Sequence, residues 1–92
     1  MKKTHRAVLR LLFEGNADFY YIKGRLKNLY PKMELGLNNY NITLLLNKLQ
    51  EMEYIKSIYG SYPGLYGITP KGIGYVNLSV LEGVNHDKPS GP

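Results

Sequence analysis

A change of hydrophobic period near residue 53 constrains the fold most. Over residues 39–52 the apolar side chains recur at the spacing of one helix face, namely Ile42, Leu45, Leu46, Leu49 and Met52. Asn38 or Asn39 can cap this helix. Directly afterwards, residues 54–59 (YIKSIY) and 65–69 (LYGIT) are rich in the β-branched and aromatic residues that favour strands. We therefore expect a helix that runs straight into a pair of strands.

The segment between the two strands has the composition of a turn. Residues 60–64 (GSYPG) supply the glycines and the proline of a hairpin loop. After the second strand we expect a last helix that begins at Pro70, with Thr69 as its cap. Proline suits this position because the first helical N–H needs no partner inside the helix. The apolar face of this helix would be Ile73, Val76, Val80 and Val84.

Two more helices are expected before residue 31. Residues 4–14 form the first, with Thr4 as its cap and Gly15 at its end, and residues 18–29 form the second, with Asp18 as its cap. Their apolar positions are Ala7, Val8, Leu11 and Leu12 in the first helix, and Ile22, Leu26 and Leu29 in the second. The order of helix, helix, helix, hairpin and helix is an α+β class that is mainly α, and it is the winged helix-turn-helix arrangement.

Length and composition bound the possible functions. A chain of 92 residues predicts one domain, which we place at residues 1–82, with a disordered tail at 83–92. The net charge of +5 favours an anionic partner such as nucleic acid, although solubility alone is a simpler explanation. The chain has no cysteine and no apolar run of a membrane span's length, so we expect a cytoplasmic protein, of a microbe or one of its viruses.

Two stretches carry a resemblance to a known family. Residues 42–55 (ITLLLNKLQEMEYI) and 66–76 (YGITPKGIGYV) resemble the recognition helix, the wing and the start of the terminal helix in small MarR-like and PadR-like transcriptional regulators. The resemblance covers residues 4–82, and it implies a DNA-binding protein whose third helix enters the major groove. The chain departs from the family at Glu53, where many relatives have glycine, and in a wing tip that has no Lys or Arg.

The third helix would present its polar side to DNA. With its apolar stripe buried, the opposite side carries Tyr40, Asn41, Thr43, Leu44, Asn47 and Lys48. Asparagine can bond to adenine, threonine to a base edge, and lysine to guanine or phosphate. The alternative is that these are ordinary surface residues of a helix.

Further residues are candidates for the sugar-phosphate backbone. These are Lys23 and Lys27 on the second helix, Lys56 on the wing, Tyr62 at the hairpin tip and Lys71 just beyond the wing. Phosphate contacts position a protein and make its binding sensitive to salt. For each single lysine the alternative is a solvated surface charge, and Tyr62 could equally face solvent.

The sequence predicts a sequence-specific, double-stranded-DNA-binding transcriptional regulator that is a homodimer. Its dimer surface would be Ile73, Val76, Val80 and Leu81, unless these residues only close the core of one chain. The alternative function is a winged-helix protein-interaction module without DNA binding. The two histidines, His5 and His86, have no ligand or triad spacing around them, so we expect no enzyme, no metal and no cofactor, while an effector ligand stays open.

Overall fold

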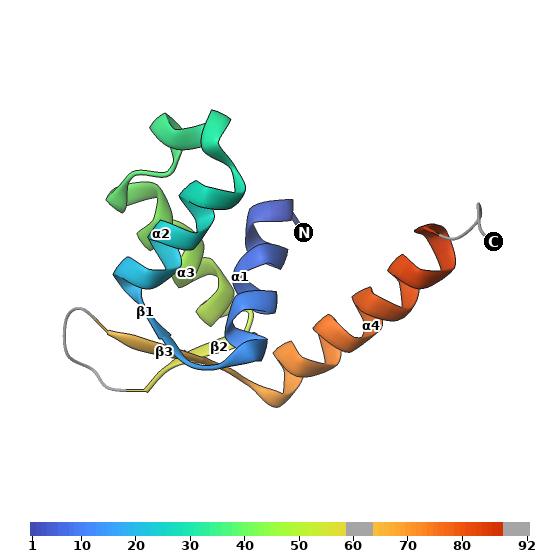
Figure 1. Cartoon of the computed structure of the whole chain (residues 1–92). Helices are drawn as coiled ribbons and strands as arrows, with labels where there is room; N and C mark the ends of the chain where they lie inside the picture. Colours follow the sequence, from blue (N-terminus) through green and yellow to red (C-terminus); the bar gives the residue numbers. More distant parts are fainter. Residues whose placement is uncertain (59–63, 88–92) are drawn as a thin grey trace.

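Three helices pack around an apolar core, a small antiparallel sheet closes one end, and a fourth helix leaves the body (Figure 1). The computed structural model describes residues 1–58 and 64–87, of which residues 34–35 and 79–87 are described by their backbone alone. The helices are α1 (Lys3–Glu14), α2 (Phe19–Leu29), α3 (Asn39–Glu51) and α4 (Pro70–Asp87), with a 3₁₀ segment η1 (Pro31–Gly36) before α3. The strands are β1 (Ala17–Asp18), β2 (Ile55–Ser57) and β3 (Leu65–Ile68). The predicted winged helix-turn-helix fold is confirmed.

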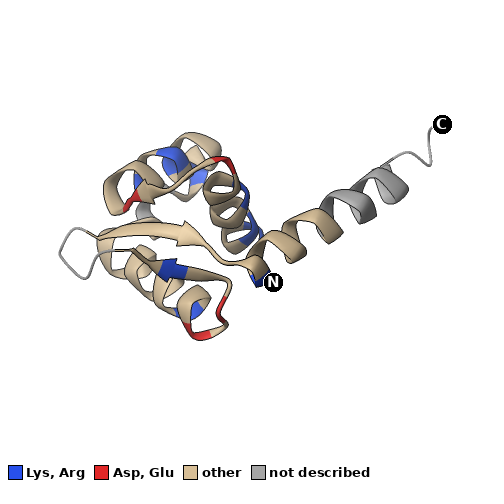
Figure 2. Cartoon of the chain, turned by 90° about the horizontal axis from the view of Figure 1, so that it is seen from below, with Lys and Arg blue, Asp and Glu red and all other residues tan. Residues whose placement is uncertain are grey.

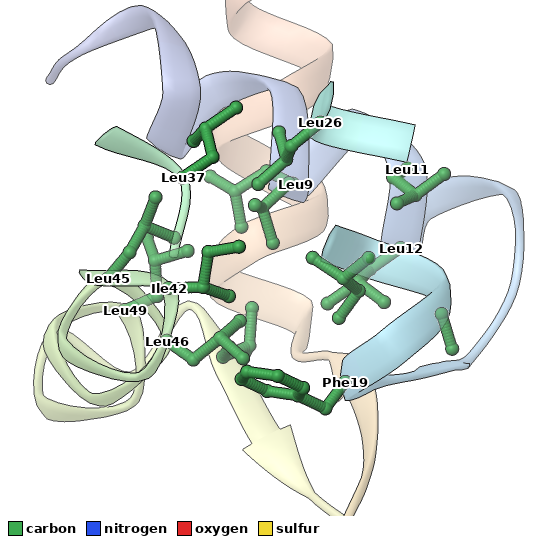
Figure 3. Close-up of a cluster of buried hydrophobic side chains, with 14 of the residues drawn as sticks. Leu9, Leu11, Leu12, Phe19, Leu26, Leu37, Ile42, Leu45, Leu46 and Leu49 are labelled. Atoms are coloured by element: carbon green, nitrogen blue, oxygen red, sulfur yellow. The ribbon is translucent and has the colours of Figure 1, made fainter. Parts of the chain in front are cut away.

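The core is built from one face of each of the first three helices (Figure 3). Its fully buried side chains are Val8, Leu9 and Leu12 of α1, Ile22 and Leu26 of α2, and Ile42, Leu46 and Leu49 of α3. Each such burial stabilises the fold by about 1.5–3 kcal/mol. Leu29 was expected in this core, but it is 55% exposed because the chain turns away at the end of α2 and Tyr30 packs there instead.

Side-chain caps begin three of the helices. The Asp18 carboxylate accepts a hydrogen bond from the Tyr21 N–H at 2.8 Å, and the Asn38 side chain accepts one from the Asn41 N–H at 2.8 Å. Both predicted caps are confirmed, as is Thr69 at the start of α4. The prediction for Thr4 was wrong, since α1 begins one residue earlier behind Lys2 and Thr4 is buried within its first turn.

The sheet has three strands, in the order β1-β3-β2, and not the two of the predicted hairpin. In the wing, β2 pairs with β3 so that Ile55 lies opposite Ile68. The short β1 pairs with the other edge of β3, with Ala17 opposite Tyr66. A strand of two residues is too short to show the alternation of apolar and polar side chains, so the sequence did not predict β1.

The last helix is longer than predicted. The tail expected from residue 83 is helical as far as Asp87, so the helix continues through Gly83 and ends before Pro89, the first proline after Pro70. Residues 88–92 lie outside the described residues. Near its start α4 packs against α1 through Val76, and beyond that point it runs away from the body (Figure 1).

Candidate nucleic-acid interface

Burial fixes the side of α3 that faces outwards. Ile42, Leu46 and Leu49 are fully buried, so the helix cannot rotate about its axis without exposing them. The opposite side is open to solvent, with Tyr40 71% and Leu44 49% exposed. We call Tyr40, Thr43, Leu44, Asn47 and Lys48, all of which are exposed, the outer face of α3.

Two polar groups on this outer face are unengaged. Among residues 1–33, 36–58 and 64–78, whose side chains the structure describes, neither the Thr43 hydroxyl nor the Asn47 amide has a hydrogen-bond partner. The Lys48 ammonium lies 4.0 Å from a carboxylate oxygen of Glu51, and both side chains are largely in solvent, so the pair is weak. Thr43, Asn47 and Lys48 are therefore available to a ligand that lies along α3.

Asn41 is different from its neighbours on α3. Its side-chain Nδ2 donates to the Gly36 carbonyl at 3.1 Å, which ties η1 to the first turn of α3. A bidentate bond to adenine needs this same amide group as a donor. One of the two N–H donors of Asn41 is thus engaged and its side chain is held in place, whereas the whole amide of Asn47 is unengaged.

Basic side chains lie on both sides of α3. The Lys23 ammonium of α2 donates to the Asn39 side chain at 2.5 Å, and this bond places a positive charge at the start of α3. Lys27 follows one turn further along α2 and is half-buried. Figure 2 shows one basic position on the wing, which is the exposed Lys56 of β2, and none on β3. The contact of these three lysines with the phosphate backbone stays a prediction.

Lys71 has a partner within the chain. Its ammonium donates to the Met52 carbonyl at 2.8 Å and lies 4.9 Å from the centre of the Tyr54 ring. Met52 ends α3, where unpaired carbonyls attract a positive charge. The structure therefore gives Lys71 a role at the end of α3, whereas the sequence indicated a phosphate contact.

The residues around Lys71 form a bonded link between the end of α3 and the start of α4. The Thr69 hydroxyl donates to the Glu53 carbonyl at 2.6 Å and accepts from the Gly72 N–H at 3.1 Å. A Cβ at Gly72 would overlap the Tyr54 carbonyl oxygen, so only glycine fits. We call Met52, Glu53 and Tyr54 together with Thr69, Lys71 and Gly72 the α3–α4 junction.

Glu53 has a left-handed backbone conformation, with φ of 64°. The Tyr54 N–H bonds to the Leu49 carbonyl at 3.0 Å and the Glu53 N–H to the Gln50 carbonyl at 2.9 Å, which is the Schellman pattern of a helix end. Glycine adopts this conformation without strain, which is a physical reason for the glycine that the family resemblance implies at this position. The departure noted in the sequence thus marked a backbone constraint.

The remaining predicted site residues divide between the core and the undescribed part. Val76 is only 3% exposed and closes the core, while Ile73 is 38% exposed on α4. The side chains of Val80 and Leu81 and the whole of Tyr62 lie outside the described residues. Tyr20 and Tyr21 are half exposed on α2.

His5 lies in a groove of about 320 Å³ beside the start of α3, which Asn41 and Leu44 also line. Its Nδ1 atom is buried without a hydrogen-bond partner among the described residues. Burial lowers the pKa of His5 below its ordinary value, and the nearby charges of Lys2, the amino terminus and Lys48 lower it further. His5 is therefore neutral near pH 7 and adds no charge to the interface.

Neither a metal centre nor a membrane span is found in the part of the chain that the structure describes. No group of three or more His, Asp or Glu side chains there is arranged to hold a metal ion. None of the described helices combines the length and the apolar character needed to cross a bilayer. The polar and basic surface around α3 is therefore the candidate functional site.

Comparison with known proteins gives matches among solved structures only. No protein-family model matches the chain, and no curated protein matches it in sequence. A transcriptional regulator from Clostridium thermocellum, Cth-833, is 31% identical with a TM-score of 0.64, over 91% of this chain and 82% of that one. A double mutant of ZitR from Lactococcus lactis is 26% identical with a TM-score of 0.70, over 88% of this chain and 51% of that one. Its apo form is 25% identical with a TM-score of 0.72, over 92% of this chain and 60% of that one.

The fold, the outer face of α3 and the wing together define a winged helix-turn-helix protein. With the likeness to Cth-833 over most of both chains, the protein belongs to the winged helix-turn-helix transcriptional regulators. The chain spans between half and three-fifths of the length of the ZitR chains it matches. The proteins it resembles are regulators and not enzymes.

Proposed function

We propose that the protein is a sequence-specific, double-stranded-DNA-binding regulator of transcription that acts in the cytoplasm and catalyses no reaction. One observation carries this proposal. The outer face of α3 presents the unengaged Thr43 and Asn47 groups and the exposed Leu44 side by side, on a helix whose other side is locked in the core. The major groove admits an α-helix, and these residue types contact adenine, base edges and the thymine methyl group.

The flanking lysines support the same docking. With α3 in the major groove, Lys23 and Lys27 of α2 contact the phosphates of one DNA strand. Lys56 of β2 contacts the phosphates next to the wing. Such contacts set the register without reading sequence, and each released counterion steepens the fall of affinity with salt. The bond from Lys23 to Asn39 holds its charge beside α3 before DNA arrives.

Selection of bound duplexes from a random pool, followed by fluorescence anisotropy across a salt series, tests this function. We expect one enriched sequence, and affinity for it that falls steeply with salt. The double variant Asn47→Ala, Lys48→Glu should lose the preference for that sequence. Arg10→Glu, which makes the same charge change as Lys48→Glu on α1, is the matched control. No enrichment and no binding at low salt would refute the proposal and leave the protein-interaction module.

We further propose that two copies associate through α4. Ile73 is 38% and Leu78 is 55% exposed on this helix, and α4 leaves the body where a second copy can reach it (Figure 1). Two copies would read two half-sites and gain the affinity that one small domain lacks. Val76 is not part of this surface, because it is already buried against the core.

Light scattering coupled to size-exclusion chromatography tests the dimer. Leu78→Asp should shift the mass from two chains to one, and Asn28→Asp, which adds the same charge at an exposed position of α2, should not. A wild-type mass of one chain at all concentrations would contradict the dimer without affecting DNA binding by α3.

A further inference from the structure

A groove of about 370 Å³ lies between α1 and α2, and the proposed DNA binding does not use it. Its floor is apolar and consists of Ala7, Leu11, Leu29 and Tyr30. Its rim carries four cations against one carboxylate, namely Lys3, Arg6, Arg10 and Arg25 against Glu14. The exposed Leu29, which the helix pattern assigned to the core, belongs to this floor.

The cations of the groove are held in place without being neutralised. The Arg25 guanidinium donates to the Tyr21 hydroxyl at 2.8 Å, and the Lys3 ammonium lies 5.6 Å from the centre of the Tyr30 ring. Arg6 donates to the Met1 carbonyl at 2.7 Å. Over the residues with described side chains, 1–33, 36–58 and 64–78, the sole ion pair is Lys48–Glu51 on α3, so the groove's cations have no carboxylate partner there.

The groove lies away from the outer face of α3. Tyr21, Arg25 and Leu29 follow one another at every fourth residue, so they form one stripe along α2. Lys23, which reaches α3, is two positions from Tyr21 and therefore about 200° around the helix from it. A partner in the groove would leave the outer face of α3 free for DNA.

The groove is long enough for a segment of polypeptide. A second hollow of about 420 Å³ continues towards β1 and shares Leu11 and Glu14 in its wall. Together the two hollows follow the 12 residues of α1, which is a length of about 18 Å. Charge changes sign along this path, from the cations near Lys3 and Arg10 to the carboxylates of Glu14 and Asp18.

We propose that this groove is a docking site for an acidic, amphipathic segment of a partner protein. The apolar side of the segment packs on Leu11 and Leu29, and its carboxylates pair with the cations Arg10 and Arg25 of the rim. An apolar floor favours such a segment over nucleic acid, whose backbone needs a polar surface. The opposite charge at the Asp18 end fixes the direction in which the segment lies.

Fluorescence anisotropy of a labelled probe peptide on the full chain tests this docking site. The probe is a helix of about 14 residues, or four turns, with Leu and Phe on one face and Glu residues beside them at one end. We expect it to bind, and we expect Arg10→Glu and Leu29→Ser each to weaken it about tenfold or more. Lys56→Glu on the wing, an equal charge change outside the groove, should leave it unchanged. A short mixed-sequence duplex should not displace the probe.

Several outcomes would overturn the proposal. Equal weakening by Lys56→Glu would mean unspecific charge attraction, and displacement by the duplex would mean that the probe occupies the DNA surface. Unchanged binding of a peptide with Gln in place of Glu, or with its Glu residues moved to the other end, would remove the role of charge. Competition by octanoate at the peptide's own concentration would assign the groove to a small amphipathic anion. Arg10→Glu should keep its DNA affinity, so this test fails or succeeds independently of DNA binding.

Discussion

The α3–α4 junction and the outer face of α3 lie at the end and along the side of the same helix, yet they are opposite in character. In the junction, the side chains of Thr69 and Lys71 are hydrogen-bonded within the chain, and Gly72 has no space for a Cβ atom. On the outer face, Thr43 and Asn47 have none among the described residues. The stretches that carry the family resemblance therefore contain both kinds of residue: those of the junction hold the fold, and Thr43 and Asn47 within residues 42–55 stay free for a ligand.

The largest effect is expected at Gly72 in the junction. Gly72→Ala places a Cβ onto the Tyr54 carbonyl oxygen, and since backbone must move, we expect a loss of about 3 kcal/mol in the free energy of unfolding. Gly74→Ala is the matched control, because space is open there. It should raise stability by about 0.5–1 kcal/mol through helix propensity. Urea unfolding of both variants measures this, and equal effects would show that the junction is not tight.

Asn47→Ala on the outer face of α3 should weaken DNA binding without changing stability, unlike a substitution in the junction. We expect about tenfold weaker binding to the selected duplex, the loss of one bidentate contact, with an unchanged unfolding midpoint. Asn28→Ala, at an exposed position of α2, should change neither quantity. Anisotropy titration and thermal unfolding of the same preparations measure both. An unfolding midpoint that falls with Asn47→Ala would place this residue with the junction.

Glu53→Gly should strengthen the junction. Glycine adopts the left-handed conformation of residue 53 without strain, so the free energy of unfolding should rise by about 1 kcal/mol. Glu53→Ala removes the same charge but keeps the strain, and it should stay within about 0.5 kcal/mol of the wild type. Urea unfolding compares the three proteins, and an equal gain for alanine would assign the effect to charge.

Lys71→Met should give the smallest effect and decides to which region Lys71 belongs. Loss of its bond at the end of α3 should lower stability by about 0.5 kcal/mol, without altering the salt dependence of DNA binding. Lys56→Met on the wing should instead reduce that salt slope by about one. A reduced slope for Lys71→Met would restore the phosphate contact that the sequence indicated.

Much of the fold was predictable because its features are local. The stripe from Ile42 to Leu49 and the caps at Asp18, Asn38 and Thr69 act within one helix turn, where spacing along the chain equals spacing in space. Strand β1 and the exposure of Leu29 were not predictable, because each depends on a neighbour that is distant in sequence. The candidate site divides in the same way. The pattern of α3 indicated which residues face outwards, whereas the bonds that Asn41 and Lys71 make to other segments appear only in the folded chain.

The sequence by itself determined the class of fold, the helix that faces a ligand and the basic character of the surface. Periodicity, caps and net charge are properties of the chain before it folds. Only the tertiary structure decided which polar groups remain free, why residue 53 strains its backbone, and that cations from α1 and α2 meet over an apolar floor. Such facts depend on distances between elements, and a linear sequence does not contain them until the core has fixed how those elements pack.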